Sequence, residues 1–142
     1  MKISRTPFLC HVFTVLVLGF LLSACTREVR IFDVAVNNGS EEIRIVAHLS
    51  KADANYIRNR EICAGFLLLN CDDKQDRYPF DARVDGKESP EYPKQDRSTV
   101  IFDGKIHNKI YAQFDNPCLA MEGGSYLSGN IRSNMIRLDR IP

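Results

Sequence analysis

The dipeptide Asn38-Gly39 stands between two stretches in which apolar and polar residues alternate, EVRIFDVAVN and SEEIRIVAHL. A two-residue turn between strands needs positive φ angles, which Asn and Gly adopt readily, so this arrangement strongly indicates a β-hairpin. The apolar residues of both stretches then share one face, which we expect to cover a core. A two-residue turn would pair Val34 with Ile43, Phe32 with Ile45, and Asp33 with Arg44.

Further strands are predicted along the rest of the chain. AGFLLLN is apolar on both faces, which is typical of a central strand. Phe80, Ala82 and Val84 alternate with charged residues before Asp85-Gly86, and nearby prolines restrict this short strand to an edge. Ser50 is expected to cap a single helical turn that ends at Ile57, with an irregular loop as the alternative. Other strands are expected at 98–104, 108–115, 125–132 and 134–140, with turns at 104–107 and 133 and a break at 116–117.

About seven or eight short strands with turn signals roughly every 8–12 residues indicate an all-β fold. No stretch has helical periodicity of useful length. We expect one small antiparallel β-sandwich, immunoglobulin-like or similar, with a small β-barrel as the alternative.

The amino-terminal segment has the layout of a secretory signal. Lys2 and Arg5 precede the apolar stretch FLCHVFTVLVLGFLL, and the small residues Ser23 and Ala24 precede Cys25. The apolar stretch is shorter than the about 20 residues that a transmembrane helix needs. A signal-anchor helix that stays in the membrane is the alternative.

The stretch Leu22-Ser23-Ala24-Cys25 resembles the lipobox of bacterial lipoproteins. The resemblance implies that residues 1–24 are removed and that Cys25 carries a diacylglyceryl group on sulfur and an acyl chain, such as palmitate, on its new amine. Several chains give stable anchoring, because each buried methylene contributes about 0.8 kcal/mol. Thr26, where an aspartate would favour the inner membrane, implies the outer membrane, with residues 25–142 as one domain facing the periplasm.

The charge of the expected mature chain is almost balanced. Removal of residues 1–24 takes away Lys2 and Arg5 and no acidic residue, which leaves 17 basic side chains against 18 acidic ones. The two signs are interspersed along the chain. This pattern differs from the basic stripe of a nucleic-acid-binding protein, so we expect no nucleic-acid partner.

Three cysteines besides Cys25 remain in the expected mature chain, Cys63, Cys71 and Cys118. In an oxidising compartment two of them should pair. If one extended strand joins Cys63 to Cys71, these residues lie roughly 25 Å apart, whereas a disulfide needs Cα atoms within about 7 Å. We therefore expect a Cys71–Cys118 disulfide, with Cys63–Cys118 as the alternative.

The sequence matches no catalytic or metal-binding motif that we tested. GGSYLSG has Leu127 where a nucleophile elbow needs glycine, and CDDKQD has Lys74 at a ligand position of a calcium loop. His48 and His107 are isolated, and no C-x-x-C pair accompanies the cysteines. We therefore expect no enzyme, no metal and no cofactor, although a triad assembled only in space leaves no sequence pattern.

The segment 72–97 combines charge and proline with the aromatic and arginine residues that dominate binding hot spots. Aromatic side chains in a loop stiffened by proline lose little conformational entropy when they dock. An ordinary solvated loop whose aromatic residues fold back onto the sheet is the alternative. The candidates for binding a partner are Tyr78, Phe80, Arg83, Tyr92 and Arg97.

The lipobox, the size of the mature chain, its β-rich pattern, its few cysteines and the ending CLAMEGGSYLSGNIRSNMIRL resemble the periplasmic immunity lipoproteins of type VI secretion. These neutralise antibacterial effectors, including phospholipases. The resemblance implies a partner that is a toxic enzyme, and it supplies no catalytic residues. A structural or accessory lipoprotein of a cell-envelope assembly is the main alternative, and a small periplasmic enzyme is a third.

Overall fold

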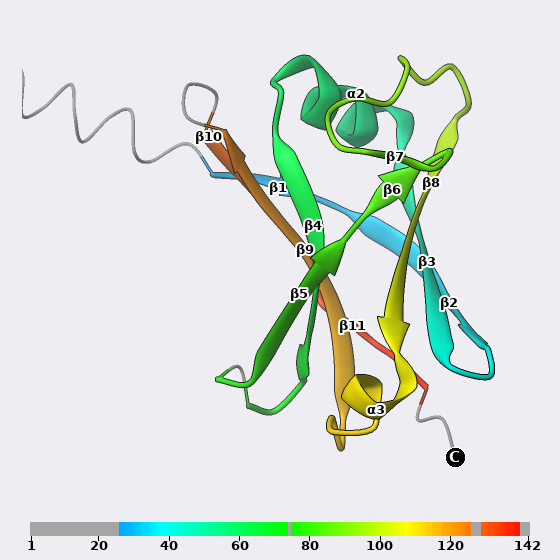
Figure 1. Ribbon diagram of the computed structural model, residues 1–142. Helices are drawn as coiled ribbons and strands as arrows, with labels where there is room; N and C mark the ends of the chain where they lie inside the picture. Colours follow the sequence, from blue (N-terminus) through cyan, green and yellow to red (C-terminus); the bar gives the residue numbers. More distant parts are fainter. Residues whose placement is uncertain (1–25, 74, 126–128, 140–142) are drawn as a thin grey trace, which may run out of the picture.

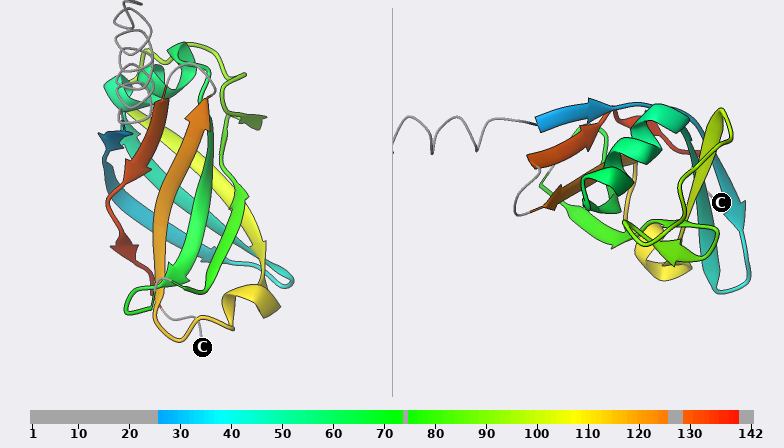
Figure 2. Two further views of the ribbon diagram at one scale, coloured as in Figure 1. Left: turned by 90° about the vertical axis from the view of Figure 1, so that its left-hand side faces the viewer. Right: turned by 90° about the horizontal axis from the view of Figure 1, so that it is seen from above.

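The computed structural model describes residues 26–73, 75–125 and 129–139, which form two β-sheets packed face to face (Figures 1 and 2). The predicted signal and Cys25 lie outside these residues. Sheet A contains β1 (Thr26–Val29), β4 (Cys63–Asn70), β5 (Arg77–Asp81), β9 (Pro117–Ser125), β10 (Gly129–Ser133) and β11 (Ile136–Arg137). Sheet B contains β2 (Ile31–Asn38), β3 (Glu42–Ser50), β6 (Arg83–Val84), β7 (Lys87–Glu88) and β8 (Thr99–His107). The helices are α2 (Lys51–Asn59) and α3 (Asn108–Tyr111).

The sheets form the predicted sandwich and not the closed barrel that was its alternative. Sheet A has the order β1-β10-β9-β4-β5 with β11 beside β9, and sheet B has the order β2-β3-β8-β6-β7. Strand pairs are antiparallel except for β1 with β10. If β1–β2 and β5–β6 are each counted as one strand, this division of the chain is that of an immunoglobulin sandwich. Helices α2 and α3 lie at opposite ends of it (Figure 1).

Two strands pass from one sheet to the other and so join the layers at both edges. β1 pairs with β10 in sheet A and continues past Arg30 into β2 of sheet B. β5 pairs with β4 in sheet A and continues past the buried Ala82 into β6 of sheet B. The single strand predicted around Phe80–Val84 is therefore divided, and its sheet A part is the edge strand that the prolines indicated. Asp85 and Gly86 make the predicted turn, with φ of 52° and 79°.

The predicted β2–β3 hairpin is confirmed, but its predicted register is wrong. Val34 pairs with Ala47 and Val36 with Ile45. The turn covers residues 39–41 rather than two residues, and it is closed by the Gly39 N–H, which donates to the Glu42 carbonyl at 3.0 Å. The observed register differs from the predicted one by an even number of residues, so the apolar residues of β3 still face the core.

Phe32 was predicted to face the core, but it is 55% exposed. The register shifts between Ile31, which pairs with Leu49, and Asp33, which pairs with His48. This irregularity places Ile31 in the core in place of Phe32. The predicted pair of Asp33 with Arg44 is also wrong, because Arg44 donates to Asp103 of β8 at 3.2 Å.

Helix α2 follows β3 directly and is longer than the predicted single turn. The Ser50 side chain accepts a hydrogen bond from the Asp53 N–H at 3.0 Å, so Ser50 is the expected N-cap. Ala54 and Ile57 are fully buried against the end of the sandwich. The chain then enters β4, which pairs with β9 on one side and β5 on the other, as predicted for AGFLLLN.

The predicted turn at residues 104–107 and the strand at 108–115 are wrong. β8 runs without interruption to His107, and Asn108–Tyr111 form α3. Gly104 marks a close approach of the two sheets, because a Cβ atom there would lie 2.5 Å from the Asp81 carbonyl oxygen. The His107 side chain accepts a hydrogen bond from the Lys109 N–H at 3.2 Å, which caps the helix.

The last third of the chain contains one strand that the prediction missed. β9 begins at Pro117, the residue expected to break the chain, and runs to Ser125. Its partners β10 and β11 correspond to parts of the two predicted carboxyl-terminal strands. Residues 126–128, within one of those predictions, lie outside the described residues.

The main core lies between the sheets. Its largest fully buried side chains are Tyr92, Phe66, Phe102, Ile31, Ile43, Ile45, Leu49, Ile57, Ile62, Leu68, Leu119 and Met121. A smaller buried cluster, which we call the outer cluster, lies on the other face of sheet A and contains Leu67, Leu69, Cys118 and Ala120. It explains why β4 is apolar on both faces.

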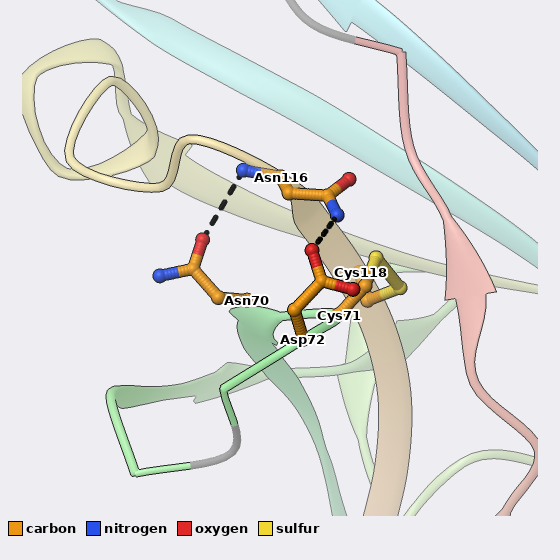
Figure 3. The surroundings of a disulfide bond; sticks show 5 residues. All are labelled: Asn70, Cys71, Asp72, Asn116 and Cys118. Carbon is orange, nitrogen blue, oxygen red and sulfur yellow. Dashed lines mark hydrogen bonds between the residues drawn. A yellow bond between two sulfur atoms is a disulfide. The ribbon is translucent and has the colours of Figure 1, made fainter.

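A disulfide joins Cys71 to Cys118 at the end of the molecule that holds α3, with a Cα–Cα distance of 5.2 Å (Figure 3). It connects the end of β4 to the start of β9. Asn116 supports the link, because its N–H donates to the Asn70 side chain at 3.2 Å and its amide donates to Asp72. Cys63, at the other end of β4, is an exposed free thiol, so the alternative Cys63–Cys118 pairing is wrong.

Candidate binding surface

The segment that follows β7, residues 89–98, has no regular secondary structure, yet hydrogen bonds hold it against α2. The Asn55 side chain accepts from the Gln95 N–H at 2.9 Å and donates to the Gln95 carbonyl at 3.0 Å. Ser89 donates to the Ile62 carbonyl at 2.6 Å. We call residues 89–98 the strap, because they lie across the α2 end of the sandwich and return the chain to β8.

Tyr92 is the centre of this attachment and not a contact for a partner. Its side chain is 1% exposed and packs edge-on against Phe102, with ring centroids 5.6 Å apart. Its hydroxyl donates to the Ala54 carbonyl at 2.7 Å, and its own carbonyl accepts from Arg58 at 2.8 Å. Burial raises the pKa of Tyr92, and the Arg58 charge opposes part of that rise. Tyr92 therefore behaves as the alternative prediction described, folded back into the core.

The other two aromatic candidates lie on β5. Phe80 is half-buried and packs on Phe66 with ring centroids 5.4 Å apart. Tyr78 is 37% exposed, nearer the start of the strand. Of the two, Tyr78 offers more of its ring to a partner.

The two arginine candidates are exposed, and they lie on different elements. The Arg83 guanidinium on β6 is 3.0 Å from a Glu88 carboxylate oxygen and 3.7 Å from Asp81. Arg97 is an exposed residue of the strap, just before β8. The fold therefore separates the five candidates into a buried anchor, two β5 residues and two surface arginines, and does not gather them at one point.

Prediction missed a groove beside β4, at the place where β5 leaves sheet A. Its volume is about 570 Å³. Its lining is mainly apolar and comes from β4 and β5, together with Ala82 and Ser89. The carboxylates around it belong to Asp81, Glu88 and Glu122, and Arg83 pairs with the first two of these. An apolar lining with charged groups around it suits a protein segment that inserts one apolar side chain.

A second hollow of about 740 Å³ adjoins the end of α2 and is lined by Arg58, Asn59, Glu61, Cys63, Pro90 and Glu91. Cys63 lines both hollows, and so lies between them. Cys63, the cysteine left over by the expected Cys71–Cys118 pair, was the sequence signal that could have pointed to this surface.

The outer face of sheet B also carries exposed apolar side chains. His48 pairs in register with Asp33 on one side and with Ile101 on the other. Ile101 is 46% exposed, and the neighbouring Phe32 is more exposed still. His48 lies on the face opposite the core, with its Nδ1 atom 3.7 Å from the Asp33 carboxylate.

Ser125 and His107, considered in the sequence for catalytic chemistry, take part in secondary structure. Ser125 of the GGSYLSG segment ends β9 and pairs with Gly129 of the antiparallel β10, so a strand-to-helix elbow is not formed. His107 is used as a helix cap. No group of three or more His, Cys, Asp or Glu side chains within 26–73, 75–125 and 129–139 could hold a metal ion.

Comparison with known proteins adds no relative. The chain matches no family model, no curated protein and no solved structure at a significant level. Among the helices of the described residues, none has the length and apolar character needed to cross a membrane.

Proposed function

We propose that the chain is an outer-membrane lipoprotein, anchored through Cys25 and facing the periplasm, which binds and neutralises a type VI secretion effector such as a phospholipase. The lipobox and the signal layout support the anchor. The observation that carries the binding role is the fixed position of the strap. Hydrogen bonds that involve Tyr92, Asn55 and Ser89 hold the strap against α2 and the core.

A surface ordered before binding favours tight inhibition. Association normally costs free energy for the ordering of loops and long side chains, and a pre-ordered surface avoids part of that cost. The strap already has its backbone fixed, and the groove beside β4 is bounded by strands. Arg97 and Tyr78 are exposed next to these rigid elements and can contact a partner without ordering a long loop.

The anchor contributes to inhibition by placing the protein where a lipase would act. Two proteins confined to one membrane surface meet at an effective concentration set by the tether rather than by bulk dilution. Blocking the catalytic entrance of such an enzyme requires complementary contacts and no reacting group on the inhibitor.

The test is a growth competition on a solid surface. A deletion strain that lacks this protein is mixed with its wild-type sister, or with a sister whose type VI secretion is inactive. The deletion strain should lose against the secreting sister only, and expression of the protein should restore its growth. Equal growth in both mixtures would contradict the immunity function and favour the envelope-assembly alternative.

The contacts are tested in the same competition. Arg97→Glu and Tyr78→Ala should weaken the protection, whereas Lys105→Gln, an exposed change on the outer face of sheet B that removes an ion pair with Glu42, should not. Full protection by both of the first two variants would locate the partner elsewhere on the sandwich.

A further inference from the structure

The register of sheet A fixes which end of the domain lies next to Cys25. β1 begins at Thr26, so the fold starts one residue after the proposed lipid attachment, and one residue spans at most about 3.6 Å. Thr26 pairs with Asn130, Asn130 with Gly124, and Gly124 with Cys63. These residues form one row across the sheet at the end of the molecule that holds α2 (Figures 1 and 2).

Basic and aromatic side chains gather at the same end. The Arg27 guanidinium lies 4.1 Å from the centre of the Tyr56 ring, and that of Arg60 lies 5.7 Å from it. Arg27 also makes an exposed ion pair with Asp53 at 3.2 Å. Tyrosine and arginine are typical of protein surfaces at the membrane interface, where the ring lies at the level of the headgroups.

The two ends of the sandwich differ in charge. Residues 26–30, 51–61 and 89–98, at the α2 end, contain seven basic and five acidic side chains. Residues 37–42, 70–73 and 108–117, at the opposite end, contain five acidic side chains and one basic side chain. An anionic membrane surface attracts the first end and repels the second.

We propose that the β1 side of α2 lies against anionic lipid headgroups, with Arg27, Tyr56 and Arg60 in contact with them. The strap, on the other side of α2, then stays open to the partner (Figure 2), and the end with the disulfide points away from the membrane. The inference rests on the proposed lipid anchor. A tether of one residue holds the row of Thr26 and Cys63 near the bilayer, and the charge difference selects the orientation.

Cys63 is a native reporter for the test, because it is exposed and lies in the row of Thr26. The full-length lipoprotein is reconstituted into phosphatidylcholine vesicles containing phosphatidylglycerol, and a fluorophore is attached to Cys63. A second protein carries Cys63→Ser and Ser40→Cys, with the fluorophore in the β2–β3 turn. β3 has nine residues, so the two positions lie roughly 30 Å apart along the sandwich.

A lipid with a quencher on its headgroup should reduce the fluorescence at Cys63 and leave that at Ser40→Cys unchanged. Equal quenching at the two positions, or stronger quenching at Ser40→Cys, would overturn the orientation while leaving the anchor intact. If neither protein floats with the vesicles and Cys25→Ser changes nothing, the anchor itself is wrong and the inference fails with it.

Charge variants separate headgroup contact from the effect of the short tether. Arg27→Gln and Arg60→Gln should reduce the quenching at Cys63 in vesicles with phosphatidylglycerol. Arg44→Gln is the matched control, because Arg44 makes an exposed ion pair with Asp103 at the same 3.2 Å distance but on sheet B. The proposed contact would be contradicted if Arg44→Gln reduced the quenching as much as Arg27→Gln and Arg60→Gln do. It would also be contradicted if neither Arg27→Gln nor Arg60→Gln reduced the quenching.

Discussion

The two ends of the sandwich are closed by different physical means. At the α2 end, Ala54, Ile57 and Tyr92 fill the space between the sheets, and hydrogen bonds hold the strap over them. At the other end, the Cys71–Cys118 disulfide joins two neighbouring strands of one sheet, and α3 covers the core. The first end depends on burial in the folded state, whereas a covalent link acts mainly by restricting the unfolded chain.

This difference matters because the strap, which we propose binds the partner, belongs to the end without a covalent link. The strap can present Arg97 on a fixed backbone only while Tyr92 stays buried. Substitutions at the α2 end should therefore affect stability and binding together, whereas changes at the disulfide should affect stability alone.

The largest effect is expected from Tyr92→Ala. Removing a buried aromatic side chain leaves a cavity and should lower the free energy of unfolding by about 3–5 kcal/mol. Tyr92→Phe, which removes only the hydrogen bond to Ala54, should cost about 1 kcal/mol. Urea denaturation measures both, and equal losses for the two variants would show that the ring itself contributes little.

The next effect is that of the disulfide. Replacing Cys71 and Cys118 together by alanine should lower the free energy of unfolding by about 2–4 kcal/mol, because the link closes a loop with a sequence separation of 47 residues. Cys63→Ser serves as the control and should change it little. The double variant should still protect cells at a temperature where it is folded, and loss of protection there would contradict a purely structural role of the disulfide.

A smaller loss is expected from Ser50→Ala. It removes the N-cap of α2 and should cost about 1 kcal/mol. Ser40→Ala, in the β2–β3 turn, is the control and should stay within about 0.5 kcal/mol of the parent protein. Thermal unfolding of the two variants compares the α2 end with the turn directly, and similar values would remove the proposed role of the cap.

The smallest effect at neutral pH comes from Tyr111, at the end with the disulfide. Burial, helped by the charge of Asp139, raises the pKa of Tyr111 to about 12. Because the folded state holds the proton more tightly than the unfolded state does, this contribution is complete below pH 10 and is lost as the pH rises from 10 toward 12. Tyr111→Phe should flatten the dependence of unfolding on pH in that range, and an unchanged slope would contradict the assignment.

Local patterns in the sequence predicted the elements that local chemistry determines. The alternation around Asn38-Gly39 indicated the hairpin, and Ser50 as a capping residue indicated the start of α2. The length of an extended strand between Cys63 and Cys71 pointed to Cys118 as the disulfide partner. Each of these depends on residues near in sequence or on the reach of the chain.

The errors arose where contacts between distant segments decide the structure. Gly104 looked like a turn residue, but it is needed because β5 of the other sheet passes close to it. Tyr92 was a candidate for binding a partner, but the space between α2 and β8 that accommodates it is formed only in three dimensions. The groove beside β4 likewise depends on β5 leaving its sheet at Ala82, which alternation of apolar residues does not reveal.

The most direct test of the account is an inhibition titration. The enzyme that co-purifies with the mature lipoprotein from its own envelope is separated, and its activity is measured as the purified lipoprotein is added back. The account predicts that activity falls linearly and reaches zero at one equivalent, and that Arg97→Glu shifts this titration to higher concentration. Unchanged enzyme activity at excess lipoprotein, or turnover of the substrate by the lipoprotein itself, would contradict it.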